Sequence, residues 1–425
     1  MTAVDHFSSQ RKSLKLSLID AFLYSLMVGA GETYLPAYAL SIGLSEVFAG
    51  ILATLPLVSG AFLQLFAPQV LKKVGSAKNW VVFSAVLQAS SFVPLVYFAD
   101  HKAPGFWTLF LILTLYWGAG FSISPAWNYW MGHLVPENES HQFFSRRSRI
   151  SQLGLMIGLI GGGVALHNHV GMGPFSSVFA TLFLFAFVCR IISSVVLSRK
   201  FFRAEWFLEE NLVGFKKTWE VFLKSPEKRK FFSKLFPFIL SVYISAPFVT
   251  PYMLGQLKMN YGDFMIAIVA LLVGKVLASF WLEKNKKPAS AFQIFSWGVI
   301  GICPAPLGWI FSENLYYIIG LQILSGFAWG LYEVGLALIF FNNLRKEEKV
   351  SAITIYNLIN SLGIIMGTLL GAIFLNMTKL DRDHYVMLFA MAAAFRLLTS
   401  WALVRDRSQM TTPKGKTEPF QSRVG

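Results

Sequence analysis

Three ionisable side chains, Glu32, Lys275 and Glu333, lie within long apolar stretches of the sequence. A charged group at membrane depth costs free energy, so residues of this kind are candidates for function by default. A medium of low dielectric favours the neutral form of a carboxyl group, so Glu32 and Glu333 could bind and release a proton in ion coupling. Glu32 could instead be held by a hydrogen bond to a neighbouring helix, or be reached by water from outside.

The ammonium group of Lys275 needs an acidic partner, and the sequence offers two, Glu333 and Glu32. Lys275 could neutralise a carboxylate, bind an anionic substrate, or alternate between the two during transport. A static salt bridge, or a side chain that extends toward the membrane surface, is the structural alternative. Removing one partner of a buried ion pair costs about 3–5 kcal/mol, so we expect loss of Lys275 alone to impair folding.

Two segments, 117–128 and 322–333, place polar and aromatic residues on one helix face, within about 40° at 100° per residue. Such faces could form the walls of a substrate site, although an aromatic stripe can also serve packing alone. Gln152 and Asn357, in other segments, could donate hydrogen bonds to a substrate or to a neighbouring helix. The candidate substrate-binding residues are Lys275, Gln322, Trp329, Trp117, Ser124, Asn128, Asn357 and Gln152.

Membrane-spanning helices must position these residues. Hydrophobic residues make up 55% of the 425 residues and charged residues only 14%, a composition that excludes ordinary water-soluble domains. The apolar segments reach the roughly 20 residues that a spanning helix needs and are too long for barrel strands, which predicts an all-α polytopic membrane protein. The twelve predicted transmembrane helices are 16–40, 47–71, 79–99, 105–133, 147–168, 175–198, 232–257, 262–283, 291–311, 315–341, 351–375 and 384–404.

The positive residues give the orientation. Of the 37 Lys and Arg residues, only Lys102, Lys258, Lys379 and Arg382 fall in the loops on one side, and three lie within spans. The remainder gather on the side of both termini, so we expect both termini to be cytoplasmic. The net charge of +15 therefore reflects membrane topology and not a nucleic-acid partner.

The longest polar stretch, residues 199–231, separates the first six predicted spans from the last six. Apolar residues recur in it at helical spacing from Leu212 to Phe222, which fits an amphipathic helix on the membrane surface or a solvated linker helix. The predicted organisation is an N-terminal six-helix bundle (1–198), a cytoplasmic connector (199–231), a C-terminal six-helix bundle (232–404) and a disordered cytoplasmic tail (405–425).

The two halves also repeat in sequence. The segment Leu153–Gly158 resembles Leu362–Gly367, and Arg190 and Arg396 occupy equivalent places in spans 6 and 12. A repeated arginine favours a structural role, such as hydrogen bonding to helix carbonyls. We expect the glycines of spans 5 and 11 to allow close helix approach at the interface between the halves. Two six-span repeats joined by a connector are typical of a transporter with its site between the halves.

On these features the chain resembles the major facilitator superfamily (MFS) over nearly all of residues 16–404. The family signature between spans 2 and 3 would fall on 68–76, where only Gly75 and the basic Lys73 match. Its second-half counterpart is Ser279 followed by Glu283 and Lys284. Span 5 lacks the proline that marks drug/proton antiporters, so the subfamily stays open.

The resemblance implies an MFS fold and a transporter, not an enzyme. We expect a secondary active transporter that moves a small organic solute by alternating access, with Glu32 and Glu333 as proton-coupling residues. A facilitative uniporter, or a non-transporting sensor or scaffold on the same fold, is the alternative. We expect the partners to be the solute, a proton or another ion, and membrane lipids, with no cofactor, no metal and no nucleic acid. The predicted location is the plasma (inner) membrane, as a monomer.

Overall fold

The computed structural model describes residues 3–64, 73–169, 175–203, 220, 226–284, 289–342 and 346–405. Within these residues all regular structure is helical. Eleven of the helices are long and apolar enough to cross a membrane, and a shorter apolar helix, Glu46–Gly60, supplies the twelfth element. The predicted all-α polytopic fold with twelve membrane helices is therefore confirmed.

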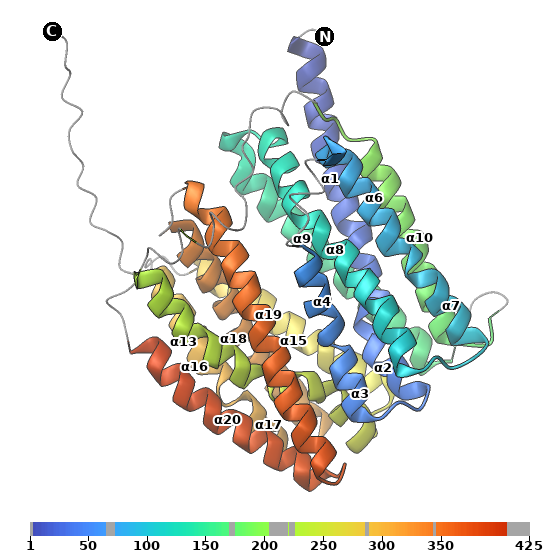
Figure 1. Cartoon of the computed structure of the whole chain (residues 1–425), viewed down its shortest axis with the longest axis vertical. Coiled ribbons are helices and arrows are strands. Elements are labelled where there is room, and N and C mark those ends of the chain that lie inside the picture. Colours follow the sequence, from blue (N-terminus) through green and yellow to red (C-terminus); the bar gives the residue numbers. More distant parts are fainter. Residues whose placement is uncertain are drawn as a thin grey trace.

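Figure 1 shows two groups of helices, one formed by the elements from α1 to α10 and the other by those from α13 to α20. In the N-terminal half α1 packs against α9 and α10, and α8 packs against α4 and α6. The helices of this half are α1 (Ala3–Ala30), η1 (Glu32–Tyr34), α2 (Leu35–Ser41), α3 (Glu46–Leu52), α4 (Leu55–Gln64), α6 (Ala77–Ser90), α7 (Phe92–Asp100), α8 (Phe106–Leu134), α9 (Glu137–His167) and α10 (Val178–Ser198).

The C-terminal half repeats this arrangement, with α13 against α19 and α20, and with α18 against α15 and α16. Its helices are α13 (Pro226–Tyr243), η2 (Ala246–Phe248), α14 (Val249–Pro251), η3 (Tyr252–Gln256), α15 (Tyr261–Lys284), α16 (Ala291–Ile302), α17 (Ala305–Phe311), α18 (Leu315–Asn342), α19 (Lys346–Met377) and α20 (Arg382–Val404).

The first span of each half is interrupted in the same way. A 3₁₀ turn, η1, follows α1, and a 3₁₀ turn, η2, follows α13. The short helix beyond each turn contains a proline, Pro36 as the second residue of α2 and Pro251 as the last residue of α14. The third spans also break at equivalent points, at Ser91 in one half and at Cys303–Pro304 in the other. These shared interruptions support the internal repeat that the sequence indicates.

The glycine-rich faces pack chiefly within each half, and the prediction that they line the interface between the halves is wrong for most of them. A Cβ on Gly158 would overlap the Leu26 carbonyl of α1, and one on Gly367 would overlap the Leu240 carbonyl of α13. Gly163 is the exception, because a Cβ there would lie 2.5 Å from the Cβ of Met265 in α15. The glycines therefore set the spacing between spans 1 and 5, and between spans 7 and 11, where a larger residue could not fit.

The halves contact each other along α3 and α4 with α19, along α9 with α15, and where α2 and α3 meet η2 and α14. We name the side where α1 begins and α20 ends the terminal side, and the opposite side, which holds α2, α3 and η3, the far side. Figure 1 shows the two halves diverging toward the terminal side. The contacts that hold the halves together therefore concentrate toward the far side.

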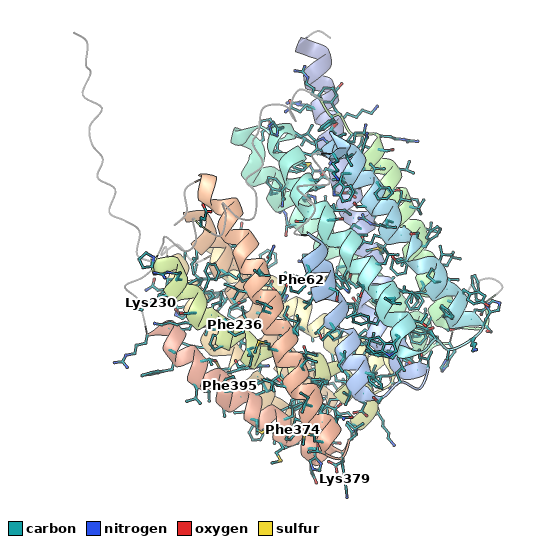
Figure 2. The ribbon with its side chains drawn as sticks, in the orientation of Figure 1. Phe62, Lys230, Phe236, Phe374, Lys379 and Phe395 are labelled. Carbon is teal, nitrogen blue, oxygen red and sulfur yellow. The ribbon has the colours of Figure 1, made fainter. Side chains whose placement is uncertain are left out.

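Large apolar side chains cover the outside of the bundle, as a lipid environment requires. Phe62, Ile300 and Phe395 are between 37% and 55% exposed. Figure 2 shows cations at the opposite ends of the C-terminal half, Lys230 near the start of α13 and Lys379 beyond the end of α19. The amphipathic segment around 212–222 except residue 220, the 405–425 tail beyond its first residue and most of the 68–76 signature lie outside the described residues.

Candidate functional site

The structure pairs Lys275 with Glu333. The Lys275 Nζ on α15 donates a hydrogen bond to the Glu333 Oε1 on α18 at 2.7 Å. Glycines bring these helices together, because a Cβ on Gly326 would overlap the carbonyl of Leu271 and a Cβ on Gly330 would lie 3.2 Å from the Lys275 Cα. The close packing of α15 on α18 thus selects Glu333 as the partner of Lys275.

This ion pair is exposed and not buried. The side chain of Lys275 is 28% exposed and that of Glu333 is 53% exposed. The expectation of a buried acid at this position is therefore wrong for the present conformation. The exposure has a chemical consequence, since the carboxylate is not enclosed by the surrounding helices.

Tyrosines from two further helices lie within the electrostatic range of Glu333. The Glu333 charge acts on Tyr243 of α13 and on Tyr356 of α19, and Tyr356 shares a side-chain hydrogen bond with Tyr332 of α18. Polar side chains from α13, α15, α18 and α19 therefore lie in one region of the C-terminal half. Phenolic hydroxyls can both donate and accept hydrogen bonds, as recognition of a polar solute requires.

Glu32 of the N-terminal half has a different partner. It lies in η1, where α1 is interrupted, and the hydroxyl of Tyr116 on α8 donates a hydrogen bond to its Oε2 at 2.5 Å. The Tyr116 side chain is buried, and Tyr24 also lies within range of the Glu32 charge. Glu32 is thus held by a neighbouring helix, and it is not the partner of Lys275 in this structure.

The predicted wall on α8 is partly open to solvent. Trp117 and Phe121 stack with ring centroids 5.5 Å apart, and Ser124 and Asn128 follow as exposed residues. The Asn128 Nδ2 donates a hydrogen bond to the Ser124 Oγ at 3.5 Å. The amide of Asn128 therefore keeps most of its hydrogen-bonding capacity for another molecule.

The other candidate residues divide by exposure. Gln152 on α9 is exposed, and Asn357 on α19 is partly buried. Trp329 packs edge-to-face against Tyr332, with ring centroids 5.5 Å apart, next to the Glu333 pair. Gln322 is only 4% exposed, so in this conformation it lies within the bundle and not on an open wall.

Sequence reasoning missed a charged cluster at the terminal side of the N-terminal half. Asp20 of α1 is 4% exposed; its Oδ1 accepts a hydrogen bond from the Ser193 hydroxyl at 2.7 Å, and its Oδ2 lies 3.8 Å from an Arg147 nitrogen. Arg190 donates to the same serine at 2.9 Å. The only indication of this cluster in the sequence was Asp20 itself, four residues inside the predicted first span.

The two equivalent arginines are both buried. Arg396 on α20 donates hydrogen bonds to the carbonyl of Val242 at 2.9 Å, to the carbonyl of Ile302 at 3.3 Å and to the Ser245 hydroxyl at 2.8 Å. This arginine joins α13, α16 and α20, which is the structural role expected from the sequence. Arg190 instead enters the Asp20 cluster through Ser193.

On the far side the halves close through polar contacts. The Gln256 amide of η3 donates to both carboxylate oxygens of Glu46 at the start of α3, at 2.9 and 3.1 Å. The charge of Glu46 also acts on the buried Tyr385 of α20. Phe248 meets Gly50 of α3 so closely that a Cβ there would clash. A cavity of about 620 Å³ between the halves adjoins this contact. Among the described residues no group of three His, Cys, Asp or Glu side chains could hold a metal ion.

The comparison with protein families decides the class. A family model described as the Major Facilitator Superfamily matches residues 18–368. The chain belongs to the Major Facilitator Superfamily. As a member of this superfamily with eleven helices long and apolar enough to cross a membrane, the chain is a multi-pass membrane transporter of small solutes.

Solved structures share the transporter's fold. The xylose transporter XylE from E. coli, in a partially occluded inward-open conformation, aligns with a TM-score of 0.65 at 12% identity, over 96% of this chain and 100% of its own. The nucleoside transporter NupG aligns at 0.61 and 13% identity, over 92% and 98%. FucP in its outward conformation aligns at 0.62 and 14% identity, over 92% and 98%. No curated protein sequence matches the transporter.

Proposed function

We propose that the protein is a secondary active transporter that moves a small organic solute by alternating access and is coupled to protons. The observation that carries this proposal is the exposed Lys275–Glu333 pair, because its two partners can separate when another group competes for one of them. A proton on Glu333 removes the carboxylate charge and releases the Lys275 ammonium. An anionic group of the solute could then replace the carboxylate.

The arrangement of the two halves supports alternating access. The Glu46–Gln256 contact and the close approach of Phe248 to Gly50 close the far side. The halves diverge toward the terminal side, which the distribution of Lys and Arg predicts to be cytoplasmic (Figure 1). This conformation would expose the Lys275–Glu333 pair to the cytoplasm, and rupture of the Glu46 contact would expose it to the outside.

Glu32 is the second proposed proton-coupling residue. Its carboxylate is held by Tyr116 in the half that faces Lys275 and Glu333, so one acid stands in each half of the transporter. We propose that Trp117, Ser124, Asn128 and Gln152 form the N-terminal wall of the solute site. Trp329 and Asn357 would form the C-terminal wall together with the Lys275–Glu333 pair, and Gln322 would join them only if the bundle rearranges.

A thermal-shift screen across metabolite classes would identify the solute, since a molecule that binds the folded state raises its melting temperature. The identified solute then allows the coupling test in reconstituted liposomes. Glu32→Gln and Glu333→Gln should abolish accumulation driven by a pH gradient and leave solute exchange largely intact. Glu313→Gln, at an exposed carboxylate next to α18, is the matched control and should accumulate solute normally.

The alternatives predict other outcomes of the same test. A facilitative uniporter would equilibrate the solute in every variant and would never accumulate it. A sensor or scaffold would bind the solute without flux. If Glu32→Gln and Glu333→Gln both accumulate solute as the unmodified protein does, proton coupling through these residues is excluded.

A further inference from the structure

The charged cluster at the terminal side of the N-terminal half is unbalanced. Three cations, Arg147, Arg190 and Lys200, surround the single carboxylate of Asp20, and the charge of Asp20 acts on both Arg147 and Lys200. Lys200 is 1% exposed, Arg190 3% and Asp20 4%. Charges removed from water require partners of the opposite sign, and among the described residues Asp20 is the one carboxylate that acts on these three cations.

Lys200 shows this shortage of negative charge most clearly. An ammonium group carries three donors, yet the hydrogen bond of Lys200 goes to the Met131 thioether, a weak acceptor, at 3.2 Å. The Lys200 Nζ lies over the Trp130 ring, 4.4 Å from its centroid. The chain is fixed beside it, because the Phe201 amide donates to the Ser13 hydroxyl at 2.8 Å and the Trp130 indole donates to the Phe201 carbonyl. Among the described residues, no carboxylate accepts a hydrogen bond from the Lys200 ammonium group.

Unpaired donors occur in the same cluster. The Nε atoms of Arg147 and Arg190 and the indole Nε1 of Trp127 are buried without a hydrogen-bond partner. The Arg147 guanidinium stacks over the Trp127 ring at 4.3 Å, and its distance of 3.8 Å to Asp20 is too long for a hydrogen bond. Since buried donors without acceptors cost free energy, these groups point to an acceptor that the described residues do not supply.

We propose that Asp20, Trp127, Arg147, Arg190 and Lys200, here named the basic cluster, form a binding site for a phosphate-type anion. Arg147 is the entry point, because its side chain is 24% exposed while the rest of the charged groups are buried. The planar guanidinium matches phosphate oxygens in pairs. Two sources supply this chemistry at a membrane surface, the headgroup of an anionic phospholipid and a free phosphate in the water.

The melting temperature of the purified full-length protein in a nonionic detergent tests the site. Phosphatidylglycerol is compared with phosphatidylcholine at equal mole fraction, and inorganic phosphate with chloride at equal ionic strength. We expect the anionic probe to raise the melting temperature by about 2 °C or more relative to its control. A response to phosphatidylglycerol alone identifies the lipid as the source, and a response to inorganic phosphate identifies the free anion. No response to either probe overturns the proposal.

Two variants locate the response. Arg147→Gln should lose it, and Arg146→Gln, at an exposed position next to it on α9, should keep it. Equal losses in both variants would mean a general surface-charge effect and would overturn the site. Lys200→Met tests the site even if Arg147→Gln does not fold, since it removes one of the three cations of the basic cluster. It should raise the melting temperature without the anion and weaken the response; a lower melting temperature with a full response would contradict the proposal.

Discussion

Replacement of Lys275 or Glu333 should cost little folding stability, although both residues lie on membrane helices. The N–O distance of 2.7 Å is short, but the side chains are 28% and 53% exposed. Exposed ion pairs contribute about 0.2–1 kcal/mol, whereas removal of one partner from a buried pair costs about 3–5 kcal/mol. The exposure places this pair in the first class and corrects the strong destabilisation that the sequence alone predicted.

A double-mutant cycle of Lys275→Met and Glu333→Gln measures the pair directly. The coupling energy should be about 1 kcal/mol or less, and each single variant should lower the melting temperature by no more than about 2–4 °C. Arg382 and Glu313 form a matched control pair at 2.8 Å, with side chains 48% and 52% exposed, and should give a similar coupling energy.

A large coupling energy in the same double-mutant cycle would refute this reasoning. A coupling energy of about 3 kcal/mol or more for Lys275 and Glu333, with a small value for the control pair, would show that the pair is desolvated. The solute site would then be closed to water in the stable conformation. In that case the proposal that a proton or solute enters from the terminal side would also be wrong.

Three further results follow from single features of the structure. Gly158→Ala should destabilise the protein by about 1–3 kcal/mol in a melting experiment, whereas Gly161→Ala, with open space around its Cβ, should be neutral or stabilising. Burial lowers the pKa of Lys200 from 10.5 to about 8, so between these two pH values the unfolded chain binds more protons than the folded protein. The free energy of unfolding, measured relative to that of Lys200→Met, should therefore rise from pH 8 to 10.5 by up to about 3 kcal/mol in unfolding titrations. Reporter fusions after residues 215 and 410 should both read cytoplasmic, and an external signal from either would contradict the span count.

The sequence predicts the spans well, because roughly 20 consecutive apolar residues leave few alternatives to a membrane helix. It does not predict which side chains meet, because that depends on how each helix is rotated about its axis. Lys275 had two possible acidic partners in the sequence. The choice of Glu333 rests on the contact of Gly326 with Leu271, which brings α18 against α15.

The contacts of the basic cluster could not be predicted from the sequence either. Asp20 lies near the start of the predicted first span, where water would normally solvate an acid, so the sequence gives no reason to select it. Its partners come from α9, α10 and the residues that follow α10, between 127 and 180 positions away. The glycine faces were recognised but assigned to the wrong interface, since a small-residue pattern marks close packing without naming the neighbouring helix.

The distance between the two halves on the far side tests alternating access most directly. Spin labels at Ser41→Cys and Leu380→Cys, which flank the cavity between the halves, would report this distance once Cys189 and Cys303 are replaced. Alternating access predicts a second, longer distance whose population grows when Glu46→Gln weakens the contact with Gln256. A single short distance that neither Glu46→Gln nor a change of pH alters would contradict it.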